Sequence, residues 1–456
     1  MDYKEYFKGK KVTMLGLGLL GRGVNVARFL AECGAILTIT DLKTEKELAP
    51  SIKQLKKYKG LTFILGRHRL SDFREANIVI KAAGVPLDSP YINEARKHKI
   101  SVLMDASLFA KLAPKEVKII GVTGTRGKST VVHLIHHILS RKKYKGPTFI
   151  NSAVFLGGNV CGMATLPLLK KVKAGDIVVL ELDSWQLQGF GDTRTSPHIA
   201  VFTTFMRDHM NYYKGNMQQY FNDKANIFKH QKKNDTLIVG SQAKKSLSHN
   251  PFQGLPLERV VVVVNEKDLP MSWQLHIPGV HNRYNAALAI AACRALGIAE
   301  KDIKKGVESF PGVPGRLELV RVAGGVKYYN DTTATTPDGL MAALRALGSK
   351  KHGIVLIAGG NDKELVYKDA AKLIDKTVKT LVLIKGTATE KMLRELPRRA
   401  AYPVYIVGSM KEAVAAAQKN AQKGDTVLLS PGAASFGVFK NEFDRGDQFV
   451  KIVKSL

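Results

Sequence analysis

A glycine-rich segment in the first third of the chain has the residue types of a nucleotide phosphate site. It comprises Gly124, Thr125, Arg126, Gly127, Lys128, Ser129 and Thr130, between an apolar strand-like stretch and the helix-like residues 131–139. Glycines let backbone N–H groups face an anion, and the N-terminus of the following helix adds positive potential. Lys128 supplies a point charge, and the hydroxyl of Ser129 or Thr130 can ligate Mg²⁺. We therefore predict that this segment binds ATP.

The spacing of the segment is a variant of the usual phosphate loop, because five residues rather than four separate Gly121 from Gly127. A glycine- and serine-rich turn before an ordinary helix is the alternative interpretation. The order of strand, turn and helix favours phosphate binding over that alternative.

A second glycine pattern lies near the start of the chain. Gly16, Gly18 and Gly21 follow one predicted strand and precede a predicted helix. The next predicted strand, residues 36–40, ends at Asp41, an acid that can hold a ribose hydroxyl. Taken alone, this fingerprint predicts a dinucleotide such as NAD.

The composition is that of a globular protein with several domains. Its 456 residues exceed one ordinary domain and suggest about three. Hydrophobic residues make up 45% and charged residues 24% of the chain. No apolar run reaches the roughly 18 residues that span a bilayer. The first residues lack the apolar region of a signal peptide, so we expect a cytoplasmic protein.

The chain is strongly basic, with a formal net charge of +31. This excess favours anionic ligands such as nucleotides, and equally nonspecific contact with nucleic acid or anionic lipid. The sequence has no aromatic and basic module for specific nucleic-acid recognition, so we expect no such partner. Cys33, Cys161 and Cys293 lack metal-ligand spacing and are odd in number, which predicts core thiols. We expect a monomer.

Strand, glycine turn and helix recur along the chain, which predicts an α/β fold with parallel sheets. We predict a Rossmann-like N-terminal domain at 1–114, a central P-loop-type ATPase domain at 115–313 and a Rossmann-like C-terminal α/β domain at 314–456. The last boundary falls in a proline and glycine cluster. Ligands of such sheets lie beyond the carboxyl ends of the strands, where we expect Glu181, Asp208, His209 and Asp331.

Together with several other segments, these residues resemble the Mur ligase family of peptidoglycan synthesis over the whole chain. The matching segments are 16–21, 124–130, 157–160, 181–187, 208–210, 218–220, 279–285, 315–316, 330–331, 359–363, 430–431 and 439–441, with Lys224, Arg445 and Gly446. Their order and spacing agree with the family pattern. The resemblance implies a three-domain ATP-dependent ligase, and it changes the first glycine pattern from an NAD site to a seat for a UDP-sugar.

The activity that the resemblance implies is amide formation in peptidoglycan precursor synthesis. The most similar branch adds D-glutamate to UDP-N-acetylmuramoyl-L-alanine through an acyl phosphate, which forms from ATP and is displaced by the amine of glutamate. The same ligation with L-glutamate or another amino acid is the first alternative. A non-catalytic UDP-sugar-binding protein and an NAD-dependent oxidoreductase are more remote alternatives.

The family pattern also implies roles for individual residues. Lys128, Glu181, His209 and Lys224 match catalytic positions, and Asn282, Arg316 and Asp331 match further ATP contacts. Two Mg²⁺ ions are implied, held by Ser129, Thr130, Glu181, His209 and Lys224, the last as a carbamate. The UDP-sugar is assigned to Leu19, Leu20, Asp41, Lys43, Gly84 and Asn159, and the incoming amino acid to Lys363, Ser435 and Asn441.

Two positions depart from the pattern of the glutamate-adding branch. Relatives commonly have a lysine where this chain has Thr333, and often an aromatic residue where it has Glu442. The loss of a cation and the gain of a carboxylate both disfavour a dicarboxylic acceptor, so the identity of the acceptor stays open. Residues 332–335 lack the histidine usual in the branches that act on diaminopimelate, lysine or folate, which favours the glutamate-adding branch.

Overall fold

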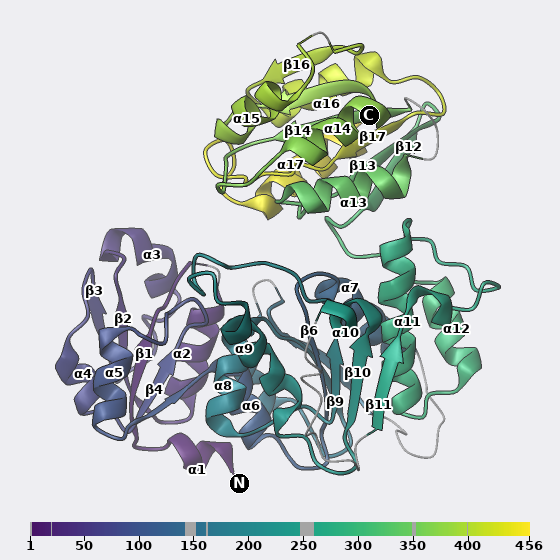
Figure 1. The fold of residues 1–456 in the computed structure, drawn as a ribbon. Helices are drawn as coiled ribbons and strands as arrows, with labels where there is room; N and C mark the ends of the chain where they lie inside the picture. The colour runs from purple at the N-terminus through teal and green to yellow at the C-terminus, as the bar shows by residue number, and fades with distance from the viewer. Residues whose placement is uncertain are drawn as a thin grey trace. The chain divides into compact units, whose positions relative to one another are not determined.

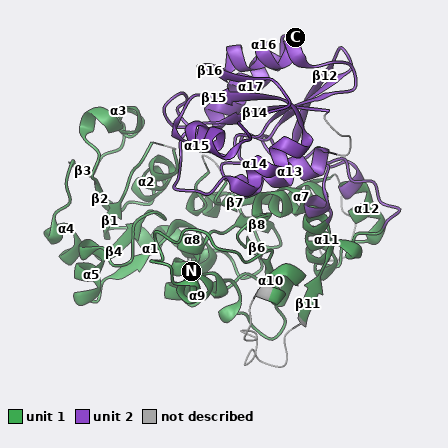
Figure 2. Ribbon diagram, turned by 45° about the horizontal axis from the view of Figure 1, so that its top comes forward, with its two compact units in different colours: residues 1–270, 284–306 green, residues 271–283, 307–456 purple. Residues whose placement is uncertain are grey.

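The computed structural model describes residues 2–19, 21–141, 152–160, 163–246, 260–348, 353–398 and 400–456. Leu20 and Cys161, both named above, lie outside the described residues. The chain divides into two compact units, residues 1–270 with 284–306 and residues 271–283 with 307–456 (Figure 2). The first unit contains two parallel sheets, and the second contains one mixed sheet.

The first sheet has five parallel strands in the order β3-β2-β1-β4-β5 (Figure 1). Its strands are β1 (Lys11–Leu15), β2 (Ile36–Asp41), β3 (Leu61–Leu65), β4 (Ile78–Lys81) and β5 (Ser101–Leu103). Its helices are α1 (Tyr3–Phe7), α2 (Arg22–Glu32), α3 (Glu45–Lys53), α4 (Leu70–Arg74), α5 (Pro90–Lys97) and α6 (Asp105–Leu112). The strand order reverses between β1 and β4, so the loops after these two strands flank the place where such sheets bind ligands.

The second sheet has six parallel strands in the order β11-β10-β9-β6-β8-β7. Its strands are β6 (Lys118–Thr123), β7 (Val154–Gly158), β8 (Ile177–Glu181), β9 (Ile199–Phe202), β10 (Thr236–Gly240) and β11 (Val260–Val264). Its helices are α7 (Lys128–Ser140), α8 (Ser184–Thr193), α9 (Met217–Lys229), α10 (Ser241–Ser246), α11 (Val280–Ala295) and α12 (Glu300–Glu308), with short 3-10 turns η1 (Leu166–Lys170) and η2 (Glu266–Asp268). The predicted phosphate loop joins the central strand β6 to α7, as expected.

The third sheet has six strands in the order β12-β13-β17-β14-β15-β16. Its strands are β12 (Glu318–Ala323), β13 (Val326–Asn330), β14 (Ile354–Gly359), β15 (Val378–Ile384), β16 (Val404–Val407) and β17 (Thr426–Leu429). Helices α13 (Pro337–Leu347), α14 (Lys368–Thr377) and α15 (Thr387–Glu395) pack on one face, and α16 (Met410–Asn420) and α17 (Glu442–Lys454) on the other.

The third sheet is mixed, whereas the first two sheets are wholly parallel. Strand β12 pairs antiparallel with β13, while the other pairs are parallel. Gly324 and Gly325 join the two strands, with φ of +56° and +75°. A two-residue turn with positive φ at both positions closes a hairpin and is too short for the crossover that parallel strands need.

The first two sheets share a hydrophobic core. Phe29 of α2 belongs to the same buried cluster as Leu166 and Leu169 of η1. The Asp105 carboxylate on α6 accepts the backbone N–H groups of Thr165 and Leu166 at 2.8 and 2.6 Å. These contacts join the two sheets into one unit, and the domain boundaries at residues 114 and 313 stay predictions. Within the described ranges, no helix is both long and apolar enough to cross a membrane.

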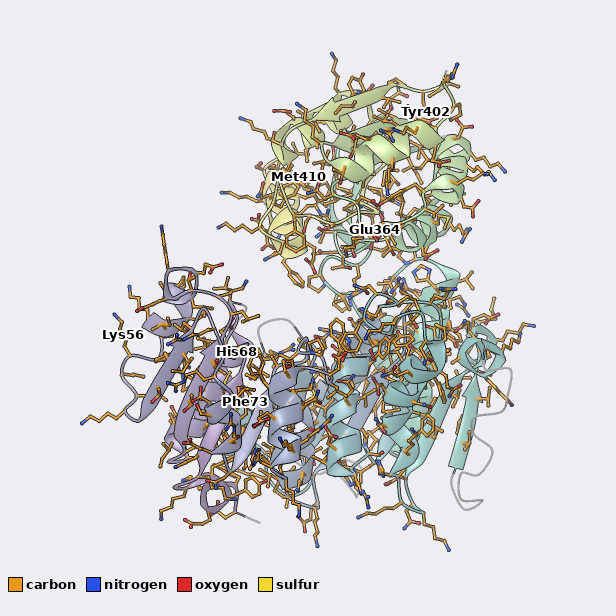
Figure 3. All side chains as sticks on the ribbon, turned by 60° about the vertical axis from the view of Figure 1, so that its left-hand side comes forward. Lys56, His68, Phe73, Glu364, Tyr402 and Met410 are labelled. Atoms are coloured by element: carbon orange, nitrogen blue, oxygen red, sulfur yellow. The ribbon has the colours of Figure 1, made fainter. Side chains whose placement is uncertain are left out.

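Packed rings support the end of β2. His68 lies beside Phe73, with their ring centroids 6.5 Å apart, and its ring centroid is 4.7 Å from that of Tyr91 (Figure 3). A ring nitrogen of His68 is 2.6 Å from the hydroxyl oxygen of Thr40. Burial lowers the pKa of His68, which keeps the ring neutral at physiological pH. The ring thereby holds the residue that precedes Asp41.

Candidate functional site

Two glycines of the phosphate loop have backbone angles and close neighbours that leave no room for a side chain. Gly124 has φ +143°, and a Cβ there would lie 2.0 Å from the hydroxyl oxygen of Thr203. Gly127 has φ +89°, and a Cβ there would lie 2.4 Å from Oδ1 of Asn285. Gly127 is also the N-cap of α7, and a glycine has no side chain with which to cap the helix. The backbone N–H groups of this turn are therefore positioned to bind an anion.

The loop is anchored on the segment that follows β9. The N–H group of Thr125 donates to the carbonyl of Thr204 at 2.8 Å, and the N–H group of Arg126 donates to the Thr204 hydroxyl at 2.8 Å. The hydroxyl of Thr203 donates to the carbonyl of Arg126 at 2.6 Å. These bonds hold the loop in shape without any ligand, which lowers the reorganisation needed to bind phosphate.

The first turn of α7 carries the three side chains predicted to act on the phosphates. Nζ of Lys128 donates to the carbonyls of Gly124 and Thr125 at 2.9 and 3.1 Å, so its charge lies within the loop. Ser129 and Thr130 are each about 8% exposed. The structure therefore brings the predicted cation and both candidate hydroxyls to the loop.

Lys224 reaches the same loop from α9. Its side chain is buried, and Nζ donates to the carbonyl of Gly124 at 3.0 Å and lies 3.4 Å from the hydroxyl of Thr123. Burial, and next the charge of Lys128, hold the pKa of Lys224 well below its usual value. Burial therefore favours the neutral amine of Lys224 over the ammonium form.

Asp208 and His209 lie in the segment that follows β9. His209 has φ +55°, an uncommon conformation for a non-glycine residue, and its ring centroid is 4.8 Å from that of Trp185. Burial, with Lys224 and Lys128 nearby, lowers the pKa of His209 despite the opposing effect of Asp208. A neutral imidazole is the form that ligates metal ions.

The Asp208 carboxylate pairs with Arg126 at 2.8 Å. Burial acts to raise the pKa of Asp208, but the charge of Arg126, together with the hydrogen bonds from Arg126 and from the backbone N–H group of His209, outweighs burial, and the pKa is lowered. Asp208 therefore stays ionised and orients Arg126 beside the loop.

Glu181 ends β8 beside the strand that leads into the loop, in register with Val122. Its side chain is buried, and no described residue forms a hydrogen bond or ion pair with its carboxylate. A Cβ on Gly158 would lie 2.0 Å from the Glu181 carbonyl oxygen, which also accepts the N–H group of Asn159 at 2.6 Å. This close approach brings the exposed Asn159 next to Glu181.

The predicted metal ligands do not form a cage of protein side chains. Within the described ranges, no three His, Cys, Asp or Glu side chains gather around one point. Mg²⁺ usually takes one or two carboxylates and completes its shell with phosphate oxygens and water. The buried, unpartnered carboxylate of Glu181 and the hydroxyls of Ser129 and Thr130 fit that requirement.

The first glycine pattern differs from a dinucleotide site. Oδ2 of Asp41 accepts the N–H groups of Leu17 and Gly18 at 2.9 and 3.0 Å, and Oδ1 accepts that of Lys43 at 2.9 Å. A carboxylate on these amides occupies donors that a dinucleotide pyrophosphate would use. Leu19, Lys43 and Gly84, all predicted for the UDP-sugar, are exposed at this edge of the sheet.

Arg22, which directly follows the third glycine, is a functional candidate that the sequence reasoning missed. Its Nε donates to the carbonyl of Met163 at 3.1 Å. Its Nη2 lies 3.4 Å from Oδ1 of Asn159 and 3.4 Å from the carbonyl of Val160. Arg22 thus links the glycine turn of the first sheet to Asn159 of the second. A basic residue at the start of the helix was the only available signal.

The second unit contains the other predicted ATP residues. Nδ2 of Asn282 donates to the carbonyl of Pro278 at 2.7 Å, and Arg316 is exposed. Asp331 is buried, with Oδ1 accepting the N–H group of Leu317 at 3.1 Å and Oδ2 accepting the Ser430 hydroxyl at 2.8 Å. Burial raises the pKa of Asp331 to about 7. Asp331 therefore fixes the residue that follows Arg316.

The residues predicted to bind the incoming amino acid follow strands of the third sheet: Lys363 follows β14, and Ser435 and Asn441 follow β17. Nζ of Lys363 donates to the hydroxyl of Thr335 at 3.2 Å, and Ser435 is buried. Oδ1 of Asn441 caps α17 by accepting the N–H groups of Phe443 and Asp444 at 3.0 and 2.9 Å. This cap leaves the amide nitrogen of Asn441 as its group for a ligand. Thr333, at the departing position, donates to the carbonyl of Gly315 at 3.0 Å.

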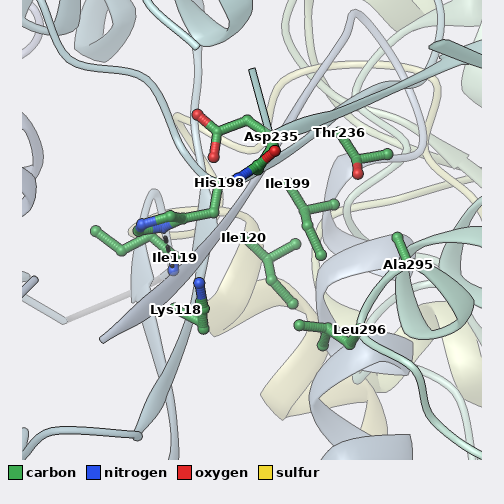
Figure 4. A pocket seen from close by; sticks show the side chains of 10 residues that line it. Lys118, Ile119, Ile120, His198, Ile199, Asp235, Thr236, Ala295 and Leu296 are labelled. Carbon is green, nitrogen blue, oxygen red and sulfur yellow. Dashed lines mark hydrogen bonds between the residues drawn. The ribbon is translucent and has the colours of Figure 1, made fainter. Parts of the chain in front are cut away.

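A cavity of about 180 Å³ lies elsewhere in the first unit (Figure 4). It is lined by Lys118, Ile120, His198, Asp235 and Leu296, among others. Lys118 begins β6, whereas the phosphate loop follows the other end of that strand. The cavity therefore lies at the opposite edge of the sheet from the predicted chemistry.

Comparison with known protein families matches all three parts of the chain. The Mur ligase MurD-like N-terminal domain matches residues 10–104, the Mur ligase middle domain matches 122–254, and the Mur ligase glutamate ligase domain matches 315–432. UDP-N-acetylmuramoylalanine–D-glutamate ligase of Roseiflexus sp. (strain RS-1) is 37% identical, over 98% of this chain and 99% of the relative. The enzyme of that name from Borreliella burgdorferi (strain ZS7) is 34% identical, over 98% of both chains.

The chain belongs to the Mur ligase family. Solved structures show the same fold. UDP-N-acetylmuramate-alanine ligase MurC of Thermotoga maritima has a TM-score of 0.59 at 18% identity, covering 98% of this chain and 99% of its own. MurF ligase of Thermotoga maritima in complex with ADP has a TM-score of 0.59 at 15% identity, covering 99% and 97%.

Membership of the family confirms the predicted fold class and enzyme class. This Mur ligase is an α/β, ATP-dependent ligase rather than an NAD-dependent oxidoreductase. The family also accounts for two glycine-rich turns in one chain, since the second is the phosphate loop of the middle domain. The individual site residues stay predictions, and the geometry above shows which of them lie together.

Proposed function

We propose that this Mur ligase uses ATP to join D-glutamate to the L-alanyl carboxylate of UDP-N-acetylmuramoyl-L-alanine. Similarity to ligases of that name, at 37% and 34% identity over 98% of the chain, carries the proposal. The preformed phosphate loop supports the use of ATP. The substrates also make the proposal one of a cytoplasmic enzyme, because ATP and UDP-sugars are cytoplasmic metabolites, and we propose that it acts as a monomer.

The proposed reaction has two displacement steps. A carboxylate oxygen of the substrate attacks the γ-phosphorus, the bond to the β–γ bridging oxygen breaks, and ADP leaves. The amine of glutamate then attacks the acyl carbon, loses a proton and expels phosphate, which completes the amide. Several anions meet in the first step, so the protein has to supply cations and aligned donors rather than a covalent nucleophile.

The phosphate loop supplies these groups. Lys128 and Arg126 carry positive charge at the loop, and the N-terminus of α7 adds positive potential. The anchoring of the loop on Thr204 keeps the donors aimed before ATP arrives. Electrostatic groups fixed in this way stabilise charge that develops during phosphoryl transfer.

Mg²⁺ is the metal that these residues fit. We assign its ligands to Ser129 or Thr130 with Glu181 for one ion, and to His209 for a second. When bound, Mg²⁺ neutralises phosphate charge and orients the γ-phosphate. Glu181 fits because its buried carboxylate has no partner among the described residues, and His209 fits because its ring is neutral.

Lys224 is proposed to carry a carbamate. Carbon dioxide adds to a neutral amine, releases one proton and leaves a two-oxygen anion at the end of the side chain. The burial of Lys224 and its approach to Lys128 favour the neutral amine from which the carbamate forms. The anion would also pair with the charge of Lys128 beside it.

The remaining substrates are assigned by domain. We propose that residues 1–114 bind the UDP-sugar, through Leu19, Leu20, Asp41, Lys43 and Gly84, with Asn159 contributed by the central domain. Residues 115–313 bind ATP, helped by Asn282, Arg316 and Asp331. Residues 314–456 bind the amino acid, whose carboxylates are assigned to Lys363, Ser435 and the Asn441 amide.

The deciding experiment measures phosphate release from ATP and Mg²⁺ with UDP-N-acetylmuramoyl-L-alanine. D-glutamate, L-glutamate and no amino acid are compared, with Lys128→Ala as the inactive control enzyme. We expect release that depends on D-glutamate. Release with L-glutamate alone would replace the acceptor by its enantiomer. Release with no dependence on the UDP-sugar would refute the proposed donor.

A further inference from the structure

Arg445 is a buried arginine in the second unit to which no role has been assigned so far. It lies in the first turns of α17 and has 0% exposed surface. Its Nε donates to the hydroxyl of Thr332 at 3.2 Å, and Nη2 donates to the carbonyl of Thr332 at 2.8 Å. Its Nη1 donates to the carbonyl of Ala433 at 3.2 Å. One guanidinium therefore spans two separate loops.

The two loops follow adjacent strands. The loop with Thr332 comes after β13, the loop with Ala433 comes after β17, and these strands pair in parallel. Besides the guanidinium, the N–H group of Gly432 joins the loops by donating to the carbonyl of Ala334 at 2.8 Å. Two residues assigned to the acceptor amino acid depend on these loops, Ser435 directly and Lys363 through its bond to Thr335.

The helix that carries Arg445 is pressed against the first loop. A Cβ on Gly446 would lie 2.6 Å from Cγ2 of Thr332, so the close packing needs glycine there. The hydroxyl of Thr332 also donates to the carbonyl of Glu442 at 2.7 Å. Arg445 is therefore held in one position and holds the loops in one arrangement.

The guanidinium has no counter-ion among the described residues. All three of its hydrogen-bond partners are neutral oxygens, and its electrostatic interaction with Glu442 is the one that favours the charged form. Burial lowers the pKa of Arg445 to about 10, so it is charged at physiological pH. A buried charge without an ion-pair partner is unfavourable, and the positive field of Arg445 is not cancelled by a carboxylate in direct contact with it.

We propose that Arg445 is a positioning residue for the acceptor site, which fixes the loops after β13 and β17 and favours a dicarboxylic acceptor over a neutral one. The inference rests on the proposed function and names the residue that compensates for Thr333. Arg445 acts through the loops and through its field, and it does not itself touch the acceptor.

The test compares Arg445→Met, which loses charge and contacts, with Arg445→Lys, which keeps the charge but cannot span both loops. For each enzyme, kcat and KM are measured for D-glutamate, D-glutamine, ATP and the UDP-sugar. Arg321→Met is the matched control, because Arg321 also donates to a backbone carbonyl of the second unit, that of Lys454 at 2.6 Å.

For Arg445→Met we expect KM for D-glutamate to rise about tenfold or more, and the preference for D-glutamate over D-glutamine to fall by a similar factor. KM for the UDP-sugar should stay within about twofold, as should all values for Arg321→Met. Arg445→Lys should lose affinity for D-glutamate but keep most of its preference over D-glutamine. That split separates loop positioning from charge.

The inference is overturned if Arg445→Met folds, by circular dichroism and thermal unfolding, and keeps its KM and its preference. A uniform loss for all substrates would show a merely structural role and would also overturn it. If Arg445→Met does not fold, Arg445→Lys decides, and an unchanged KM for D-glutamate refutes positioning. The wild-type enzyme tests the proposed function separately, and a neutral natural acceptor would refute the role of the charge.

Discussion

Two lysine side chains meet at one carbonyl of the phosphate loop. Nζ of Lys128 and Nζ of Lys224 lie 2.9 and 3.0 Å from the oxygen of Gly124. Two ammonium groups so close together in a buried place repel each other, and burial adds a further penalty on the charged form of the more buried one. The pKa of Lys224 is accordingly the one held well below its usual value. We therefore propose Lys128 as the cation of the loop and Lys224 as the amine that forms the carbamate.

Replacing Lys224 by Ala is expected to lower kcat by about 100-fold or more, because the anion that would organise the second Mg²⁺ is lost. Formate or acetate should restore part of the activity, since a small carboxylate can occupy the space left by the carbamate. Phosphate release with and without added carboxylate measures both effects.

Lys128→Ala is the matched control for that rescue. It removes a cation, so we expect phosphate release to disappear and carboxylates to restore none of it. Full activity of Lys224→Ala without rescue would refute the carbamate. Equal rescue of both variants would show that the added carboxylate acts elsewhere.

At the scale of elements, β4 ends in a buried lysine that holds the loop after it. Nζ of Lys81 donates to the carbonyl of Val85 at 3.0 Å, and the side chain is 2% exposed. Burial lowers its pKa to about 8, although Asp192, Asp183 and Asp223 act to raise it. Lys81 therefore shapes the loop that contains Gly84, which is proposed for the UDP-sugar.

The charge of Lys81 should make its effect on stability depend on pH. In the unfolded chain its pKa is near 10.5, so between about pH 8 and 10.5 the unfolded state binds more protons, and this contribution to stability rises with pH. Below pH 8 the buried charge costs about 3 kcal/mol. Lys81→Met should therefore raise the free energy of unfolding most at pH 7, and less as pH increases. It should also raise KM for the UDP-sugar.

Urea unfolding at pH 7 and pH 9.5 measures the change in stability. Lys56→Met serves as the control, because Lys56 is an exposed lysine of the same sheet region (Figure 3). A stability difference for Lys81→Met that is equal at both pH values would contradict the prediction. An unchanged KM for the UDP-sugar would show that Lys81 does not shape the loop for substrate binding.

The elements were predictable where local pattern and tertiary environment agree. The predicted strand at 36–40 lies within β2, because an apolar run bounded by turns forms a strand of the parallel sheet. Strand β12 was missed, although the Gly324–Gly325 turn after its alternating sequence is a hairpin signal.

The net charge of the whole chain is unusually positive. The chain has 70 lysine and arginine residues against 39 aspartate and glutamate residues. Both nucleotide substrates are polyanions, so the net charge of +31 should raise their local concentration and their association rates at low salt.

We therefore expect KM for ATP and for the UDP-sugar to rise several-fold between about 50 and 500 mM KCl, with a smaller change in kcat. Steady-state kinetics at several salt concentrations measure the effect. Sucrose at matched osmolality is the control, because it changes water activity without screening charge. Salt-independent KM values would show that the surface charge serves another purpose.

Contiguous residues were enough to predict the phosphate loop, and the order of segments along the chain predicted the α/β class and the family. The glycines, the lysine and the hydroxyls lie within 124–130, so the loop that they form also carries the groups that would contact phosphate. The contact of Lys224 with Gly124, 100 residues away, the bridge from Arg22 to Asn159 and the clamp of Arg445 on two loops needed the tertiary structure. Burial and distant charges lower the pKa of Lys224 and leave Arg445 with neutral hydrogen-bond partners, and neither effect exists until the chain is folded.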